Sequence, residues 1–201
     1  MLNKIAPLTL TGTCVRLEPL LVQHATALAD VGLVPELWRW QPAEITSAEG
    51  MREYVAAALA QQAAGTAQPF VIVENVSGRV IGSTRYMDIA AEHDRLEIGA
   101  TWLAPPWQRS GANTEAKFLL LQHAFEKLGV QRVVFKTEAA NEKSRAAILR
   151  IGAIQEGIFR KHLITRNGRH RDMVYFSILR EEWPATKSLL EAMRHRTSVT
   201  R

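Results

Sequence analysis

The chain has 201 residues, 47% hydrophobic and 22% charged, which suits a globular protein with a sizeable core. Its formal net charge of +5 favours anionic partners such as phosphorylated cofactors, acidic substrates or RNA, although a solvated basic surface explains it equally well. No apolar run approaches the ~20 residues of a membrane span, and no secretion signal is visible. The single cysteine, Cys14, excludes an internal disulfide and a cysteine-rich zinc site, so we expect a cytoplasmic protein without a bound metal.

The first half of the chain alternates between strand and helix patterns. Ser47 fits the start of a helix that Gly65 ends, because serine caps helix starts and glycine favours helix ends. In chain order we expect a strand over 15–20, a helix over 22–31, a loop from Pro35 to Pro42 that contains Trp38 and Trp40, a helix over 47–64, a hairpin of strands 69–74 and 79–88, and a strand over 95–103.

The most informative segment is a strand, a polar turn and a helix over 103–128. Pro105 and Pro106 end the strand because proline cannot donate to a sheet ladder. The turn follows at 108–113, and we expect the helix from about Thr114 to a stop at Gly129. Its apolar residues recur at helical spacing: Phe118, Leu121, Phe125 and Leu128.

The start of this helix has the features of an anion site. Its first N–H groups have no helical partner, and the helix dipole adds partial positive charge there. Gly111 allows close approach to the backbone, and Arg109 adds a full positive charge. The turn therefore suits a phosphate or pyrophosphate, although an ordinary turn in a core is an equal alternative. Neither the P-loop nor the Rossmann glycine pattern is present.

The second half predicts a return to the same sheet. We expect a single α+β domain over 1–201, with its core over about 13–183 and one central mixed sheet. Its elements are a crossover strand at 132–138, a short helix at 141–151, a closing hairpin of 153–165 and 170–179 around Asn167 and Gly168, and a C-terminal helix over about 183–194, with a disordered tail from Ser198.

This order of elements resembles the GNAT superfamily of N-acetyltransferases over about residues 15–183. The turn 108–113 is similar to the superfamily signature Q/R-x-x-G-x-G/A. Asn141-Glu142-Lys143-Ser144, followed by 151–153, is similar to its N-x-x-S…G-[AF] segment, and 97–103 resembles the strand before the turn. The hairpin 168–179 resembles the branch that acetylates the N-termini of ribosomal proteins on alanine or serine.

The resemblance implies a mixed, mostly antiparallel seven-stranded sheet flanked by helices, with acetyl-CoA as the acyl donor and a primary amine as the acceptor. The backbone of Trp102 and Leu103 would pair with the pantetheine, on a strand that splays from its neighbour where the two prolines end it. Asn141 would hold the pantetheine arm; the alternative is that its side chain only caps its own helix. For Trp102 the alternative is that it is simply a residue of the hydrophobic core. The residues implied to bind pyrophosphate are Gln108, Arg109, Ser110, Gly111, Ala112, Asn113 and Thr114.

The chain departs from the superfamily pattern at two places. Asn113 replaces the last small residue of the signature, and we expect it to be tolerated because asparagine caps helices and accepts unusual backbone angles. No tyrosine follows Asn141 at 146–151, where many members have a general acid. Ser144 therefore remains the candidate that assists the leaving thiolate, with plain helix-start chemistry as the alternative.

Glu97 is the leading candidate for the general base. It lies in an otherwise apolar strand, where partial burial would raise its pKa. The alternative is an edge carboxylate paired with a basic neighbour; Glu92, His93 and Asp94 are rivals in a loop. We expect direct transfer in a ternary complex rather than an acyl-enzyme on Cys14, because no histidine is placed to activate that thiol.

The sequence leaves the acceptor open. By analogy Trp38, Arg85 and Tyr86 would line the acceptor side, and the basic segment 160–171 would guide an acidic substrate or a ribosomal protein. A protein N-terminus and a small-molecule amine both fit, as does a CoA-binding module without catalysis, and the chain would be a monomer or a homodimer. Nucleic-acid binding is disfavoured, since no helix-turn-helix or basic strand with interleaved aromatics is present.

Overall fold

The computed structural model describes residues 5–41, 44–165 and 168–199. Within them, all strands form one sheet in the order β1-β2-β3-β4-β5-β6-β8-β7, in which only β5 and β6 pair in parallel. The strands are β1 (Leu10–Thr11), β2 (Val15–Pro19), β3 (Gln68–Glu74), β4 (Val80–Ala90), β5 (Arg95–Leu103), β6 (Arg132–Glu138), β7 (Ile154–Ile164) and β8 (His170–Leu179).

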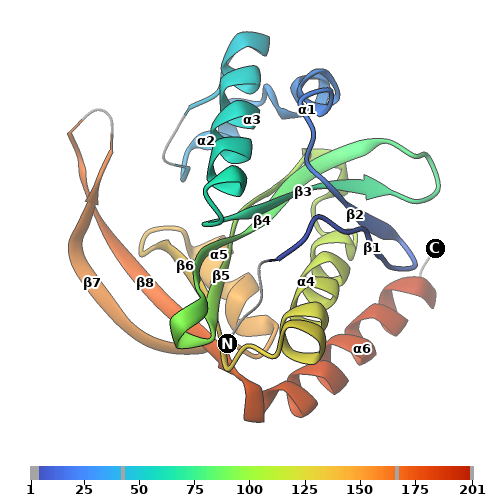
Figure 1. The fold of residues 1–201 in the computed structure, drawn as a ribbon, viewed down its shortest axis with the longest axis vertical. Helices are drawn as coiled ribbons and strands as arrows, with labels where there is room; N and C mark the ends of the chain where they lie inside the picture. The colour runs from blue at the N-terminus through green and yellow to red at the C-terminus, as the bar shows by residue number, and fades with distance from the viewer. Residues whose placement is uncertain (1–4, 42–43, 166–167, 200–201) are drawn as a thin grey trace.

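Helices cover both faces of the sheet (Figure 1). None of the described helices is long and apolar enough to cross a membrane. They are α1 (His24–Gly32), α2 (Pro35–Trp38), α3 (Ala48–Ala63), α4 (Ala112–Gln122), α5 (Glu142–Arg150) and α6 (Trp183–Val199), and a π-helical turn over His123–Leu128 extends α4 to the predicted stop at Gly129.

The α+β fold and the mostly antiparallel mixed sheet are confirmed, with three corrections. The described residues hold eight strands rather than seven, because the two-residue β1 is too short to leave a sequence pattern. Helix α2 lies in the expected loop, and α6 continues past Arg194 to Val199, so Ser198 is helical. Pro42, Asn167, Thr200 and Arg201 lie outside the described residues.

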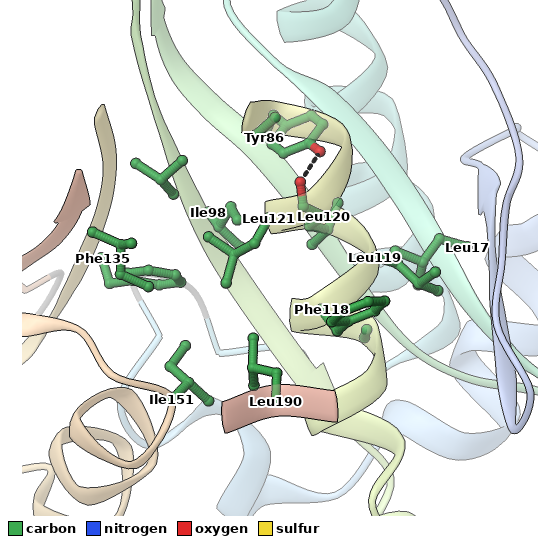
Figure 2. Close-up of a cluster of buried hydrophobic side chains, with 14 of the residues drawn as sticks. Leu17, Tyr86, Ile98, Phe118, Leu119, Leu120, Leu121, Phe135, Ile151 and Leu190 are labelled. Atoms are coloured by element: carbon green, nitrogen blue, oxygen red, sulfur yellow. Dashed lines mark hydrogen bonds between the residues drawn. The ribbon is translucent and has the colours of Figure 1, made fainter. Parts of the chain in front are cut away.

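Two apolar cores lie on opposite faces of the sheet. One joins the sheet to α4, α5 and α6, and Figure 2 shows Leu121 of α4 beside Ile98 of β5 within it. The other packs α1 and α3 against the opposite face through residues such as Leu28, Met51 and Val71. Because both cores fix β5 from its two faces, the strand holds its side chains in set directions for the site.

Strands β5 and β6 separate early. They pair only from Arg95 to Glu97, beyond which β6 continues beside β8 alone. Beyond Glu97, β5 carries a bulge: pairing with β4 jumps from Gly99 to Trp102, and Ala100 has a φ of 47°. A bulge bends its strand and increases its twist. The expected splay is therefore present, but it begins upstream of the prolines, which form a 3₁₀ turn after the strand.

Glu115 ties the start of α4 to two distant segments. Its carboxylate accepts hydrogen bonds from the backbone N–H groups of Thr13, Cys14 and Val15, at 3.0, 2.5 and 2.8 Å. The guanidinium of Arg194 on α6 lies 2.6 Å from the same carboxylate. The first turn of α4 is thus anchored on its buried side to the segment that leads from β1 into β2 and to α6.

Candidate active site

The polar turn ends in a strained, glycine-dependent helix start. Gly111 is the N-cap of α4, with a φ of 88°, and Arg109 has a φ of 60°. The helix begins at Ala112 rather than Thr114. Asn113 therefore lies inside the first turn, and the expectation that it caps the helix is wrong, since no side chain caps this start. The N-terminal amides are left to bind a ligand or water.

Side chains of the turn tie it to its neighbours. The Gln108 amide donates to the carbonyl of Leu103 at 2.9 Å, which fixes the turn against the end of β5. The Ser110 hydroxyl donates to the carbonyl of Trp107 at 2.6 Å. The Thr114 hydroxyl accepts from Arg150 of α5 at 3.1 Å. The turn is therefore held by its own side chains, and the Ala112 amide also donates to the Ser110 hydroxyl at 3.5 Å.

Trp102 and Leu103 lie on the part of β5 that has separated from β6. Their side chains are buried on opposite faces, and Trp102 packs against Trp38 with ring centroids 5.4 Å apart. The indole is thus core, as the alternative interpretation held. The backbone edge that faces away from β4 has no partner strand there among the described residues. That edge suits the amides of an extended ligand.

Glu97 closes the paired section of β5 and β6, opposite Met87 of β4 and Val134 of β6. Its side chain is buried, and its carboxylate lies 2.7 Å from the Lys136 ammonium, which also lies 2.5 Å from Asp88. Burial raises the pKa of Glu97 to about 7, outweighing the Lys136 hydrogen bond, which lowers it. Glu97 is therefore buried, as the sequence predicted. It is also paired with a basic residue, Lys136, as the alternative interpretation held.

Sequence reasoning missed Lys117 of α4. Its side chain is buried, its ammonium donates to the Thr101 hydroxyl of β5 at 2.7 Å, and it lies 5.6 Å from the Phe135 ring of β6. Burial lowers the pKa of Lys117 to about 7, although the nearby charge of Glu97 raises it. The ammonium thus bridges the two separating strands. One signal was present: Lys117 shares a helical stripe with Leu120 and Leu121.

Asn141 and Ser144 lie beyond the end of β6. The Asn141 side chain caps α5, since its amide oxygen accepts from the backbone N–H of Ser144 at 3.1 Å. The local capping interpretation of Asn141 is therefore confirmed. Ser144 is partly exposed in the first turn. Glu97 thus lies where β5 and β6 separate. The turn 108–113 follows the end of β5, and Asn141 and Ser144 follow the end of β6.

The residues expected on the acceptor side lie on two faces. Arg85 pairs with Gly99 on the face that α3 covers, and its guanidinium lies 5.1 Å from the Tyr54 ring of α3. Trp38 belongs to the same group, with its ring 5.6 Å from Tyr54. Tyr86 does not, because neighbouring residues of a strand point to opposite faces. It is fully buried, and its hydroxyl donates to the carbonyl of Leu120 at 2.6 Å (Figure 2).

The basic segment 160–171 is partly committed to internal contacts. Arg169 and Arg171 both form ion pairs with the buried Glu138, the latter at 2.6 Å. Arg171 is itself buried and donates to the carbonyl of Trp40 at 2.7 Å. Arg160 and Lys161 remain exposed. Contacts of this segment therefore hold the hairpin β7–β8 against the segment that follows α2, while Arg160 and Lys161 carry surface charge. Arg166 lies outside the described residues.

Comparison with known proteins agrees with this geometry. Residues 15–154 match the acetyltransferase (GNAT) domain. The chain is 37% identical over 110 residues to "Putative ribosomal N-acetyltransferase YdaF" of Bacillus subtilis, a match that covers 55% of this chain and 59% of that protein.

Solved structures match over more of the chain. A GCN5-related N-acetyltransferase from Brucella melitensis has a TM-score of 0.89 at 32% identity, with 95% of this chain and 87% of that chain covered. Mycobacterium smegmatis RimJ in complex with CoA-disulfide has a TM-score of 0.77 at 25% identity, with 94% of each chain covered. The resemblance drawn from the motifs is thereby confirmed: this chain belongs to the GNAT acetyltransferase family.

Proposed function

We propose that this protein transfers the acetyl group of acetyl-CoA to a primary amine by direct attack in a ternary complex. The observation that carries this proposal is the buried Glu97 carboxylate at the point where β5 and β6 separate, with its pKa raised to about 7. A carboxylate that changes protonation near neutral pH is suited to accept a proton from an attacking amine.

The donor would lie along the free edge of β5. The pyrophosphate would be bound by the amides of the turn 109–112, where the dipole of α4 adds partial positive charge, with Arg109 as a counter-ion. The pantetheine would pair with the backbone of Trp102 and Leu103, with the amide of Asn141 across from it. This path would bring the thioester to Glu97 and Ser144, so binding itself would supply the geometry of attack.

The chemistry would need one base and one acid. The neutral amine attacks the thioester carbonyl carbon and forms the new C–N bond, while Glu97 takes the proton that the nitrogen loses. The C–S bond then breaks, and the departing thiolate takes the proton of the Ser144 hydroxyl, which regains one from water in the same step. Glu97 releases its proton to water after the products leave. General base assistance of this kind is worth ~10²–10⁴ in rate.

For the acceptor we propose the α-amino group of a protein N-terminus. The support comes from a relative, which bears the name "Putative ribosomal N-acetyltransferase YdaF". A small-molecule amine is the alternative, favoured by the close packing of Trp38, Tyr54 and Arg85 on the acceptor face.

The test is an acceptor panel. The purified protein is incubated with acetyl-CoA and with peptides and small amines, and acetylated products are identified by mass spectrometry alongside the release of free thiol. Acetylation of peptide α-amines supports a protein N-terminus as the acceptor. Products from small amines alone would instead support the small-molecule alternative. Tight CoA binding without any product would instead indicate a binding module that lacks catalysis.

A further inference from the structure

Arg85 is a buried cation without a carboxylate in contact with it among the described residues. It is 6% exposed, one guanidinium nitrogen (Nη1) donates to the Gln61 side chain at 3.1 Å, and Nε has no hydrogen-bond partner. Two other cations are as strongly buried: Arg171 contacts Glu138, and Lys117 donates to the Thr101 hydroxyl. Burial lowers the pKa of Lys117 to about 7, so it can lose its charge, whereas an arginine keeps its charge. A buried charge that lacks a counter-ion is unfavourable unless a ligand supplies one.

The unpartnered polar groups on the aromatic side of Arg85 are donors. The Tyr54 hydroxyl, on the ring beneath the guanidinium, is buried without a hydrogen-bond partner, and so is the indole N–H of Trp102. Trp38 connects the two rings, since it packs against both. A site whose unpartnered groups are N–H and O–H donors next to a positive charge is complementary to an anion with two acceptor oxygens.

The same face carries the candidate base. Arg85 of β4 lies directly opposite Gly99 of β5, and Glu97 lies two residues farther along β5 on the same face. Diagonal neighbours of this kind are typically ~7–8 Å apart between strands. Gly99 has no side chain of its own between them, and a Cβ there would lie 2.7 Å from the Met87 sulfur and 2.8 Å from a Glu97 oxygen. A ligand of a few bonds that spans from Glu97 to Arg85 would therefore displace the flexible end of the Met87 side chain.

We propose that the acceptor carries a carboxylate a few bonds from its reactive amine, and that Arg85 binds this carboxylate while Glu97 faces the amine. The Gln61 contact occupies Nη1, so the Nε–Nη2 edge is the side that forms a bidentate pair with a carboxylate. Tyr54 donates its hydroxyl to the same group. This inference rests on the proposed function: it narrows a protein N-terminus to one whose first residue is Asp or Glu, and it narrows the small-molecule alternative to free amino acids.

The experiment compares matched acceptors that differ only in the carboxylate. The pairs are alanine with alaninamide, and peptides that begin with Asp or Glu with those that begin with Asn or Gln, each assayed with acetyl-CoA. The wild-type kcat/KM is expected to be about tenfold or more higher for the carboxylate member of at least one pair, as for a charged hydrogen bond. The pair that shows the preference identifies the source of the carboxylate.

Two variants assign the preference to Arg85. Arg85→Gln should abolish it, mainly through a higher KM for the carboxylate acceptor, while CoA affinity stays unchanged. Tyr54→Phe keeps the ring under the guanidinium and should weaken the preference by several-fold. Arg52→Gln, at an exposed position on the same helix as Tyr54, is the matched control and should keep it. Thermal unfolding of each variant separates loss of the site from loss of the fold.

The outcomes distinguish this inference from the proposed function. Equal kcat/KM for both members of every pair overturns the inference and leaves acetyl transfer intact. If no acceptor is acetylated, the proposed function fails, and calorimetric titration of alanine, and of the Asp and Glu peptides, into the CoA-bound protein then decides the inference. Binding of one of them that Arg85→Gln removes supports it, and no binding by any of them overturns it.

Discussion

The Glu97 carboxylate and the Lys136 ammonium lie 2.7 Å apart on the two strands that separate immediately beyond them. Burial raises the pKa of Glu97, whereas the ammonium lowers it, and the balance is a value of about 7. Burial lowers the pKa of Lys136, but its hydrogen bonds to Asp88 and Glu97 outweigh burial and raise it. Lys136 therefore stays charged while Glu97 titrates, so the pair sets the pH at which the proposed base is deprotonated.

The first prediction concerns the pH dependence of turnover. A general base acts only when it is deprotonated, so kcat/KM should rise as the pH increases through about 7 and then level off. A pH profile from 5.5 to 9, with an acceptor amine of low pKa to keep the amine neutral, measures this directly. A profile that is flat through neutral pH in that assay would assign the proton transfer to another group.

The second prediction is that Lys136→Met moves this profile to higher pH. Removal of the ammonium leaves burial and the nearby Asp88, both of which raise the pKa of Glu97. The pKa of the proposed base therefore rises and activity at pH 7 falls, while activity at alkaline pH is largely retained. Lys127→Met, at an exposed lysine, is the control and should leave the profile in place. An unchanged midpoint in Lys136→Met would show that the ion pair does not tune the base.

Much of the proposed donor site follows from local sequence signals. Prolines, glycines and apolar spacing place the turn and α4, and Asn141 and Ser47 cap the helices that they were expected to start. These signals are short-range, so they can be read without the rest of the fold. The alternation within β4 likewise already implied that Arg85 and Tyr86 could not share a face.

What the sequence could not show depends on contacts between distant segments. An alanine in the sequence gives no signal that a bulge forms there, so the bulge at Ala100 was not predicted. This bulge lies in the part of β5 that has separated from β6, upstream of the prolines where the separation was expected. Lys117 looks like an ordinary helix lysine until Thr101 and Phe135 are placed around it. The lack of a counter-ion at Arg85 is likewise visible only once its neighbours in space are known.

The third prediction tests the helix start as the pyrophosphate site. Gly111→Ala places a Cβ on a backbone with a φ of 88°, which costs about 1–2 kcal/mol and distorts the amides of the turn. CoA affinity measured by calorimetry should fall about tenfold or more, given that a factor of ten corresponds to about 1.4 kcal/mol.

A matched glycine controls for backbone strain. Gly78 has a φ of 67° in a turn where an added Cβ meets no atom within 4 Å. Gly78→Ala should therefore cost comparable stability but leave CoA affinity unchanged. Equal CoA affinity in Gly111→Ala and wild type would place the pyrophosphate elsewhere.

The fourth prediction concerns the buried Lys117. Burial lowers its pKa to about 7 in the folded state, so the unfolded chain binds an additional proton between about pH 7 and its ordinary value of 10.5. The free energy of unfolding contributed by this group therefore rises with pH across that interval. Lys117→Met should be more stable than wild type at pH 6, by about 1 kcal/mol or more, and this advantage should shrink toward pH 10.

Thermal or urea unfolding at several pH values measures this difference. Lys127→Met is again the exposed comparison and should show little change at any pH. A stability difference between Lys117→Met and wild type that is independent of pH would mean that Lys117 titrates in the folded protein as it does in the unfolded chain.

The role of Glu97 as the base is tested most directly by the rate of acetyl transfer in Glu97→Gln, measured with the best acceptor from the panel at saturating acetyl-CoA. The substitution keeps the shape and removes the proton acceptor, so kcat should fall by ~10²–10⁴. CoA affinity and thermal stability should stay close to wild type, because the turn and the cores are untouched. A Glu97→Gln protein that acetylates the acceptor at the wild-type rate would contradict the mechanism proposed for this fold.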